Sequence, residues 1–371
     1  MRVQHALGIL LAGLVCQPAE AQPQVMEPTA VWRVADPEIP VNAFQASRSA
    51  FSRDGRLIAV VRQNLLVQLR SAADGQLLGE LRADPANRDN ASLWYDVAFS
   101  KTGAIALGGL GHAEIYDGFL QHLIANLPCV CLVVEGLDFS PDGRLLAFQE
   151  VRAFPERVQR IGFVHVIDTQ SGIEIAQLNA SAGRTKVRFA ADGRTLFAMM
   201  TDVLPDRRES LGFQSWRVSD WAALRKSTEE AWTLGTFAIG RVAGRDVAAH
   251  AHDGHLEMHD SNDGKTIWSV PLLSPLFVPR DRIVKQVELT RIAVAPNGQF
   301  LVDYERPVTP HFYFQEAGAL VVRRASNGEA AAVYDVHGVT DIDIAPDSRA
   351  FLFVTGTGTP QTVMVRVPPL E

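Results

Sequence analysis

The stretch "DFSPDGRLLAF", residues 138–148, joins an apolar pair to a second apolar run through a tight polar turn. Its Asp142-Gly143 dipeptide favours a hairpin turn, and the flanking residues alternate as half-buried strands do. The pattern recurs in "AFSRDGRLIAV" (50–60), "AFSKTGAIALG" (98–108), "RFAADGRTLFA" (188–198), "AVAPNGQFLV" (293–302) and "DIAPDSRAFLF" (343–353). A repeated hairpin of this kind predicts an all-β repeat protein.

The spacing of these hairpins indicates how many units the chain holds. The apolar residue before each turn lies at positions 51, 99, 139, 189, 294 and 344, so neighbours are 40 to 50 residues apart except across one gap of 105. A degenerate copy, "AIGRVAGRDVAAHA" (238–251), fills that gap. Each unit continues into a second alternating hairpin, such as "VHVIDTQSGIEIAQL" (164–178). We therefore predict one domain, residues 22–371, folded as a seven-bladed β-propeller of four-stranded antiparallel blades.

The two hairpin patterns together resemble WD40-type repeats of the degenerate bacterial kind, and the resemblance covers nearly the whole mature chain. The Gly-His and Trp-Asp dipeptides of that family are mostly absent, so its side-chain tetrad is not carried over. The seventh unit ends one strand short, while "AVWRV" (30–34) precedes the first unit without a hairpin partner. We predict that the N-terminal strand, 31–34, closes the ring by pairing with residues 363–367.

The N-terminus has the pattern of a secretory signal peptide. Arg2 precedes an apolar run from Ala6 to Val15, and Ala19-Glu20-Ala21 is a cleavage pattern that signal peptidase accepts. We predict export with cleavage after Ala21, and the preference for arginine over lysine, typical of GC-rich bacterial genes, favours the periplasm. A lipoprotein anchor at Cys16 is the weaker alternative because the bulky Val15 precedes it.

Composition narrows the class of protein and of partner. The chain has 371 residues, 47% hydrophobic and 21% charged, with a formal net charge of −7. We expect a soluble globular protein with no membrane span after the leader. No run of lysine or arginine suits a phosphate backbone, so nucleic acid is not an expected partner.

Alternating strand direction places the short turns on one rim of the ring and the long connections on the other. The long segments are 83–96, 150–162, 201–212, 274–286 and 303–318. We predict that this loop-rich rim binds a protein partner, and that the protein is a non-catalytic interaction scaffold. The candidate contacts are Trp94, Tyr95, Arg157, Arg207, Arg208, His311, Phe312, Tyr313 and Phe314. For Phe312 and Phe314, packing onto the blade as local core is an equal alternative. A small molecule, anionic or sugar-like, on the rim or in the central channel is a further alternative.

The stretch "AHAHDGHLEMHD" (249–260) concentrates histidines in one predicted hairpin. A two-residue turn at Asp253-Gly254 pairs His252 with His255, His250 with Glu257 and Ala248 with His259. One face then carries His250, His252, His255, Glu257 and His259. Three of these imidazoles could reach one Zn²⁺, Cu²⁺ or Ni²⁺ ion. Burial against the neighbouring blade is the favoured interpretation, so no cofactor is predicted and a metal is the minor alternative.

Two further patterns bear on chemistry. Cys129 and Cys131 in "LPCVCLVV" (127–134) are expected as two buried thiols, with a strained disulfide as the alternative. "HDSNDGKTIW" (259–268) resembles one copy of the docking pattern of quinoprotein dehydrogenases, matching at Asp260, Gly264, Lys265 and Trp268. An enzyme or cofactor-dependent subunit of the quinoprotein or lactonase kind is therefore the alternative to the scaffold.

Overall fold

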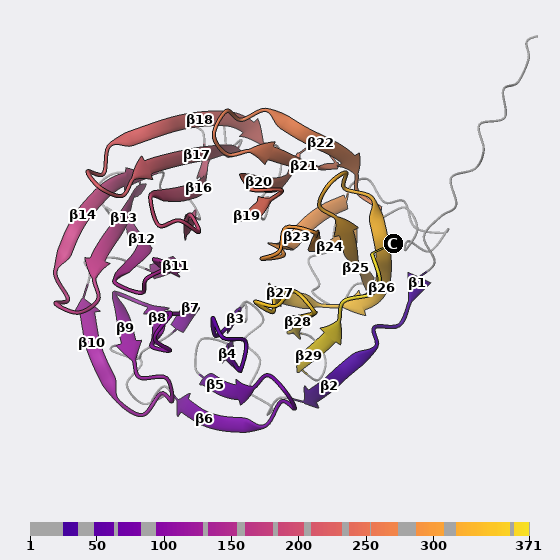
Figure 1. Ribbon diagram of the computed structural model, residues 1–371, viewed down its shortest axis with the longest axis horizontal. Helices are drawn as coiled ribbons and strands as arrows, with labels where there is room; N and C mark the ends of the chain where they lie inside the picture. Colours follow the sequence, from indigo (N-terminus) through magenta and orange to yellow (C-terminus); the bar gives the residue numbers. More distant parts are fainter. Residues whose placement is uncertain are drawn as a thin grey trace, which may run out of the picture.

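A computed structural model gives the fold, and it describes residues 25–35, 48–62, 66–82, 94–128, 133–153, 160–180, 185–203, 209–231, 237–252, 254–273, 287–307, 317–356 and 360–370. These residues form seven β-sheets arranged as a ring around a central axis (Figure 1). No helix in the described ranges is long and apolar enough to cross a membrane. The predicted seven-bladed propeller of antiparallel four-stranded blades is confirmed.

Within each blade, the strands follow one another outward from the axis. Blade 1 contains β3 (Arg48–Phe51), β4 (Leu57–Arg62), β5 (Leu66–Ser71) and β6 (Leu77–Arg82). Blade 2 contains β7 (Trp94–Phe99), β8 (Ile105–Gly109), β9 (His112–Tyr116) and β10 (Leu123–Pro128). Blade 3 contains β11 (Val133–Phe139), β12 (Leu145–Ala153), β13 (Arg160–Asp168) and β14 (Glu174–Ala180). Blade 4 contains β15 (Thr185–Phe189), β16 (Thr195–Val203), β17 (Glu209–Arg217) and β18 (Ala223–Ala231).

The remaining blades include the two N-terminal strands. Blade 5 contains β19 (Phe237–Val242), β20 (Arg245–His252), β21 (His255–Asp260) and β22 (Thr266–Pro271). Blade 6 contains β23 (Val287–Val294), β24 (Phe300–Pro307), β25 (Ala317–Arg324) and β26 (Ala330–His337), with β1 (Val25–Met26) added in parallel to β26. Blade 7 contains β27 (Val339–Ile344), β28 (Ala350–Thr355), β29 (Gln361–Arg366) and, outermost, β2 (Ala30–Ala35).

The N-terminal strand closes the ring as predicted. β2 pairs antiparallel with β29, and the register joins Trp32 to Met364, Arg33 to Val363 and Val34 to Thr362. Closure by a strand from the other end of the chain leaves no blade with an incomplete sheet. The additional pairing of β1 with blade 6 was not predicted from the sequence.

The core consists of layers between neighbouring blades, because each strand alternates its side chains between two faces. In blade 3, Ala147 and Val164 pack against Leu196 of blade 4, while Phe148 packs in the layer shared with Ile115 of blade 2. The largest layer joins blades 6 and 7. Stability is therefore distributed around the ring in blade-to-blade contacts.

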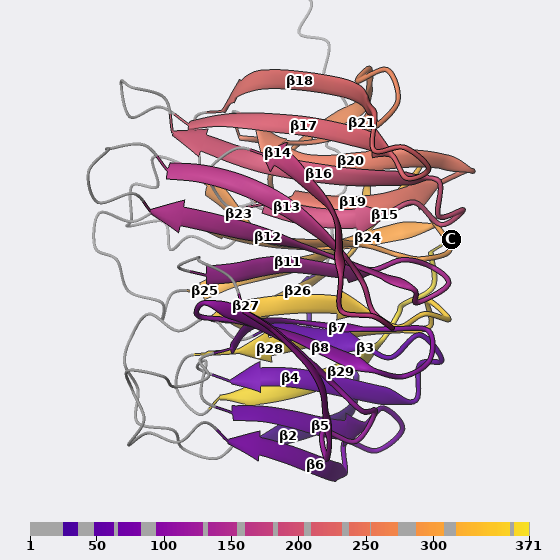
Figure 2. The same cartoon turned by 90° about the vertical axis from the view of Figure 1, so that its left-hand side faces the viewer.

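The short turns also lock each blade to the next one. The inner-hairpin turn of blade 3 has Gly143 at φ +79°, and a side chain there would contact Lys101 in the corresponding turn of blade 2. In the outer turns, Trp32 donates its indole N–H to the Ala72 carbonyl at 3.0 Å, and Trp268 donates to the Ala325 carbonyl at 2.9 Å. All these turns lie on one rim, termed here the short-turn rim, at the right of Figure 2.

Candidate functional site

The histidine hairpin forms with the predicted register. β20 pairs with β21 through His252–His255, His250–Glu257 and Ala248–His259. On the opposite face, Val247, Ala249, Ala251, Leu256 and Met258 join the core shared with blade 6. The structure therefore brings His250, Glu257 and His259 together on the face turned toward blade 4. His255 lies exposed at the start of β21, and the side chain of His252 is outside the described part of the chain.

Hydrogen bonds of His259 and its stacking on His250 fix the two histidine rings. Its Nε2 lies 3.1 Å from a Glu257 carboxylate oxygen, and its Nδ1 lies 3.3 Å from the Gly264 carbonyl. Glu257 also accepts the Ser269 hydroxyl at 3.1 Å. The rings of His250 and His259 stack, with centroids 4.8 Å apart and planes 16° apart. These partners lie within blade 5 itself.

The same geometry limits what metal chemistry this cluster offers. One candidate ligand atom from each of His250, Glu257 and His259 lies within 4.8 Å of the others. Imidazole lone pairs lie in the ring plane, so two nearly parallel rings direct them side by side and not at one point. A Zn²⁺ or Cu²⁺ ion would therefore require one ring to rotate out of the stack. The residues assemble the ligand types, while their orientation favours the structural interpretation.

A buried charge cluster in blade 6 was not identified from the sequence. Arg323 of β25 donates through Nε to Asp303 at 3.0 Å, through its second terminal nitrogen to Glu305, and through Nη1 to the Gly328 carbonyl at 3.1 Å. All three charged side chains are almost fully buried against blade 5. Burial and the neighbouring Asp303 raise the pKa of Glu305 to about 8, against the opposing effect of Arg323. One carboxyl of the pair therefore keeps its proton at neutral pH.

A second buried arginine lies at the closure seam. Arg62 of β4 is 2% exposed and reaches from blade 1 into blade 7, where it binds the Thr355 carbonyl at 3.3 Å and the Thr362 hydroxyl. Burial lowers its pKa to about 9, with a smaller contribution from Arg70. Thr362 is also the register partner of Val34 of β2, so the same residue contacts both the closing strand and blade 1. No pattern in the sequence pointed to this contact.

Aspartates on the innermost strands clamp neighbouring blades together. Asp96 of blade 2 accepts the Gly136 amide of blade 3 at 2.7 Å, and Asp138 of blade 3 accepts the Phe189 amide of blade 4 at 2.8 Å. Asp343 of blade 7 accepts the Phe51 amide of blade 1 at 2.8 Å. Each carboxylate thus satisfies an edge N–H that has no strand beside it. The sequence does contain a pattern that could have identified these aspartates. Each one lies one or three residues before the apolar residue that precedes an inner turn: Asp96 before Phe99, Asp138 before Phe139 and Asp343 before Ile344.

The predicted rim residues have different outcomes. The prediction that Trp94 is an exposed contact is wrong. Trp94 is the first residue of β7 and is only 2% exposed. Its indole N–H donates to the buried carboxylate of Glu114 at 2.8 Å. The segment that was interpreted as a loop is a strand at this point, because Trp94 fills the core between blades 1 and 2. Tyr95 is half-buried on the same strand. The described residues do not include Arg157, Arg207, Arg208, His311, Phe312, Tyr313, Phe314, Cys129 or Cys131.

The residues matched to the quinoprotein pattern have a structural role in the described part of the chain. Asp260 and Gly264 close the outer turn of blade 5 through a main-chain hydrogen bond of 2.8 Å. Trp268 packs on Gly328 of blade 6, and Trp32 packs in the same way on Gly75 of blade 1. Both tryptophans dock one blade on the next. The contact of Trp32 with Gly75 was not predicted, because β2 is remote in sequence from the blade that it completes.

Exposed apolar side chains gather on the outer strands of blades 1 to 3. We call this surface the apolar belt, and it comprises Leu77, Leu78, Phe119, Leu123, Ile124, Ile173 and Ile175, which are 42 to 63% exposed. A side chain at Gly79 would lie 3.0 Å from the Phe119 carbonyl, and one at Gly172 would lie 4.0 Å from Leu127. These contacts show that the outer strands and turns of blades 1, 2 and 3 touch one another, so the belt residues of neighbouring blades lie on adjoining surfaces.

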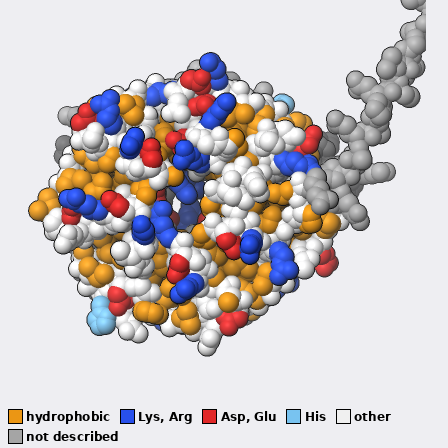
Figure 3. All heavy atoms as spheres, in the orientation of Figure 1, with side chains coloured by type: hydrophobic (Ala, Val, Ile, Leu, Met, Phe, Trp, Pro, Cys, Tyr) orange, Lys and Arg blue, Asp and Glu red, His pale blue; other side chains and the backbone are white. Residues whose placement is uncertain are grey.

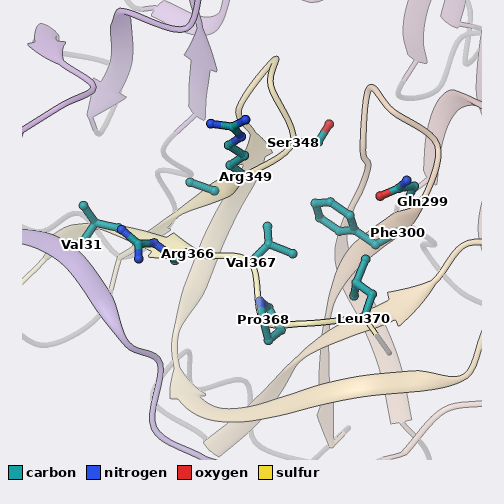
Figure 4. Close-up of a pocket in the computed structure, with 10 residues that line it drawn as sticks. Val31, Gln299, Phe300, Ser348, Arg349, Arg366, Val367, Pro368 and Leu370 are labelled. Atoms are coloured by element: carbon teal, nitrogen blue, oxygen red, sulfur yellow. The ribbon is translucent and has the colours of Figure 1, made fainter.

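A pocket of about 630 Å³ lies on the short-turn rim where the ring closes. Phe300, Val367, Pro368 and Leu370 form its apolar floor, and Arg349 and Arg366 lie toward one side with Val31 (Figure 4). The C-terminal segment is fixed there by Arg324, whose Nε donates to the Leu370 carbonyl at 3.3 Å. The pocket is therefore a product of closure.

Searches of protein-family models and of curated proteins each found no match to this chain. The likeness to WD40-type and quinoprotein repeats consequently remains a resemblance of pattern. The class that the fold defines is the seven-bladed β-propeller.

Proposed function

We propose that this protein is an exported, non-catalytic β-propeller that binds a protein partner. The observation that carries the proposal is the apolar belt, where Phe119 is 58% exposed and Ile173 is 63% exposed. Groups of large apolar side chains that stay exposed on adjoining surfaces often mark interaction sites. The leader pattern at residues 1–21 supports export, and the WD40-like repeats agree with a scaffold role.

The polar clusters of the described residues also favour binding over catalysis. The aspartate clamps, the Arg323 cluster and the Arg62 bridge each hold two neighbouring blades together. Glu305, for example, accepts the Leu273 amide of the preceding blade at 2.5 Å. These groups thus have structural partners. The loop-rich rim remains the second proposed contact surface.

Site-specific photo-crosslinking in the native cells tests this function. A photoreactive residue replaces Leu123 in the belt, Phe312 on the loop-rich rim or, as the control, Leu224 on the outer strand of blade 4. We expect an adduct of defined mass from Leu123 or Phe312 and none from Leu224. Absence of an adduct at both test positions, or purification with a stoichiometric cofactor, would reject the scaffold.

Export has its own readout. Terminal sequencing of the protein from the periplasmic fraction is expected to begin at Gln22. A protein that keeps residues 1–21 and fractionates with the cytoplasm would contradict that part of the proposal.

A further inference from the structure

Two basic side chains lie beside the central channel that the seven blades surround. Lys186 and Arg188 lie on β15, the innermost strand of blade 4, yet both are exposed. The face drawn in Figure 3 is hollowed at its centre, where lysine or arginine side chains stand with acidic side chains among them. Exposure on an innermost strand means that these side chains stand in the channel.

Charges from several blades converge on Lys186. Arg48 of β3, Arg291 of β23, Asp341 of β27 and Asp96 of β7 are all close enough to influence it. Removal from bulk water lowers the pKa of Lys186, and the two arginines lower it further against the two aspartates. Since blade 4 lies across the ring from blades 1 and 7, the lysine reaches into the bore.

The aspartates near Lys186 are occupied by main-chain donors. Asp341 accepts the Ser49 amide at 2.6 Å and its hydroxyl at 3.0 Å, and Asp96 accepts the amides of Gly136 and Leu137 at 2.7 and 3.2 Å. Burial raises the pKa of the Asp138 and Asp343 carboxyls, and Arg188 lies close enough to each to oppose that rise. Those two carboxyls also accept main-chain amides, from Phe189 and from Phe51, each at 2.8 Å. The two cations therefore have hydrogen-bond capacity directed at the channel.

We propose that the central channel binds a small multivalent oxyanion, a polycarboxylate or polyphosphate, between Lys186 and Arg188. Lysine supplies a compact charge and arginine a planar fork that matches a carboxylate or phosphate. Arg48 and Arg291 add positive potential on the side of the bore that faces Lys186. A multivalent ligand fits because its separate negative groups can contact Lys186 and Arg188 at the same time.

The net charge of the whole molecule favours a small anion over a large one. The net charge of −7 repels large polyanions from the outer surface, while Lys186 and Arg188 attract small anions into the channel. This site is separate from the apolar belt. Its failure would leave the protein-binding proposal intact.

Calorimetry on the mature chain, 22–371, tests the site with citrate and with pyrophosphate in low-salt buffer. The test variant is Lys186→Gln/Arg188→Gln, and the control is Arg144→Gln/Lys265→Gln, which removes the same charge from exposed positions on the short turns. We expect at least one probe to bind the wild type and the control equally and the test variant at least about tenfold more weakly, as loss of charge-assisted hydrogen bonds implies. The probe that binds identifies carboxylate or phosphate chemistry.

A footprint on the wild-type protein gives a second readout that needs no variant. Reductive methylation of Lys186, followed by mass spectrometry, is expected to slow when the bound probe is present, while methylation of Lys265 is unchanged. Binding of neither probe, equal affinity in all three proteins, or equal methylation of both lysines would overturn the proposal.

Discussion

The blade 4–blade 5 interface and the blade 5–blade 6 interface use the same repeat positions for different chemistry. Asp260 and Arg324 each close the outer turn of their blade, and the residues just before them are His259 and Arg323. Both of these side chains reach the carbonyl of the turn glycine, at 3.3 and 3.1 Å. Register also makes His250 of β20 the counterpart of Asp303 of β24.

The two interfaces differ in how far their polar groups are removed from water. Arg323, Asp303 and Glu305 have side chains 0 to 2% exposed and neutralise one another. In blade 5 the partner of His259 is Glu257, whose side chain is 19% exposed beside exposed His255. One position of the repeat can therefore hold a fully buried charge cluster in one blade and, in another, a buried histidine pair beside a partly solvated glutamate.

Removal of the cation from the closed cluster should have the largest effect. Arg323→Met leaves two buried carboxyls without their donor, and we expect the free energy of unfolding to fall by roughly 3–5 kcal/mol. Urea denaturation at neutral pH measures it, with Arg144→Met on an exposed turn as the control. If the free energy of unfolding fell by less than about 1 kcal/mol, as for an exposed ion pair, the Arg323 cluster would not be shielded from water.

The titration of Glu305 should give the closed cluster a distinctive pH dependence. Its pKa is raised from 4.5 to about 8, so its contribution to stability is present below pH 4.5 and is lost as the pH rises through 8. Glu305→Gln mimics the protonated form. Between pH 4.5 and 8, we expect the free energy of unfolding of the variant to rise relative to that of the wild type by up to about 1.4 kcal/mol per pH unit. Parallel stability curves at pH 5, 7 and 9 would refute the raised pKa.

The equivalent substitution in blade 5 should cost less. His259→Met removes the bonds to Glu257 and Gly264, but Glu257 keeps the Ser269 hydroxyl and access to water. We expect a loss of about 1 kcal/mol in the same denaturation assay. A loss equal to that of Arg323→Met would erase the difference between the two interfaces.

The smallest expected effect is that of added metal. Because the rings of His250 and His259 are nearly parallel, we expect Zn²⁺ to bind the purified protein more weakly than micromolar and to leave its melting temperature almost unchanged. Calorimetry is the measurement. Sub-micromolar binding that disappears in His250→Phe/His259→Phe would make the hairpin a metal centre.

Periodicity in the sequence was sufficient for the ring, because each Asp-Gly hairpin and each alternating strand is a local signal. The closing strand and the histidine register followed from the same alternation, as the pairs Val34–Thr362 and His250–Glu257 confirm. The Arg323 cluster and the Lys186 channel could not be predicted in this way. Their partners are side chains on strands that only the closed ring brings together.

Trp94 illustrates the opposite error. The segment 84–92 before it is rich in polar residues and contains a proline, so we predicted an exposed loop. The layer between blades 1 and 2 instead holds the large Trp94 side chain. Local composition does not report where a neighbouring blade lies. The exposure of Trp94 could therefore not be predicted from its neighbours in the sequence.

The central channel, the contact of Arg62 with blade 7 and both interfaces of blade 5 exist only if the seven blades close into a ring. Ala35 and Gln361 are register partners at the accessible end of the β2–β29 pair. In the double variant Ala35→Cys/Gln361→Cys, we expect mild oxidation to give an intramolecular disulfide, detected by peptide mapping, because paired strands hold their Cα atoms within bridging distance. A folded monomer in which these two cysteines stay unlinked would contradict the closed ring.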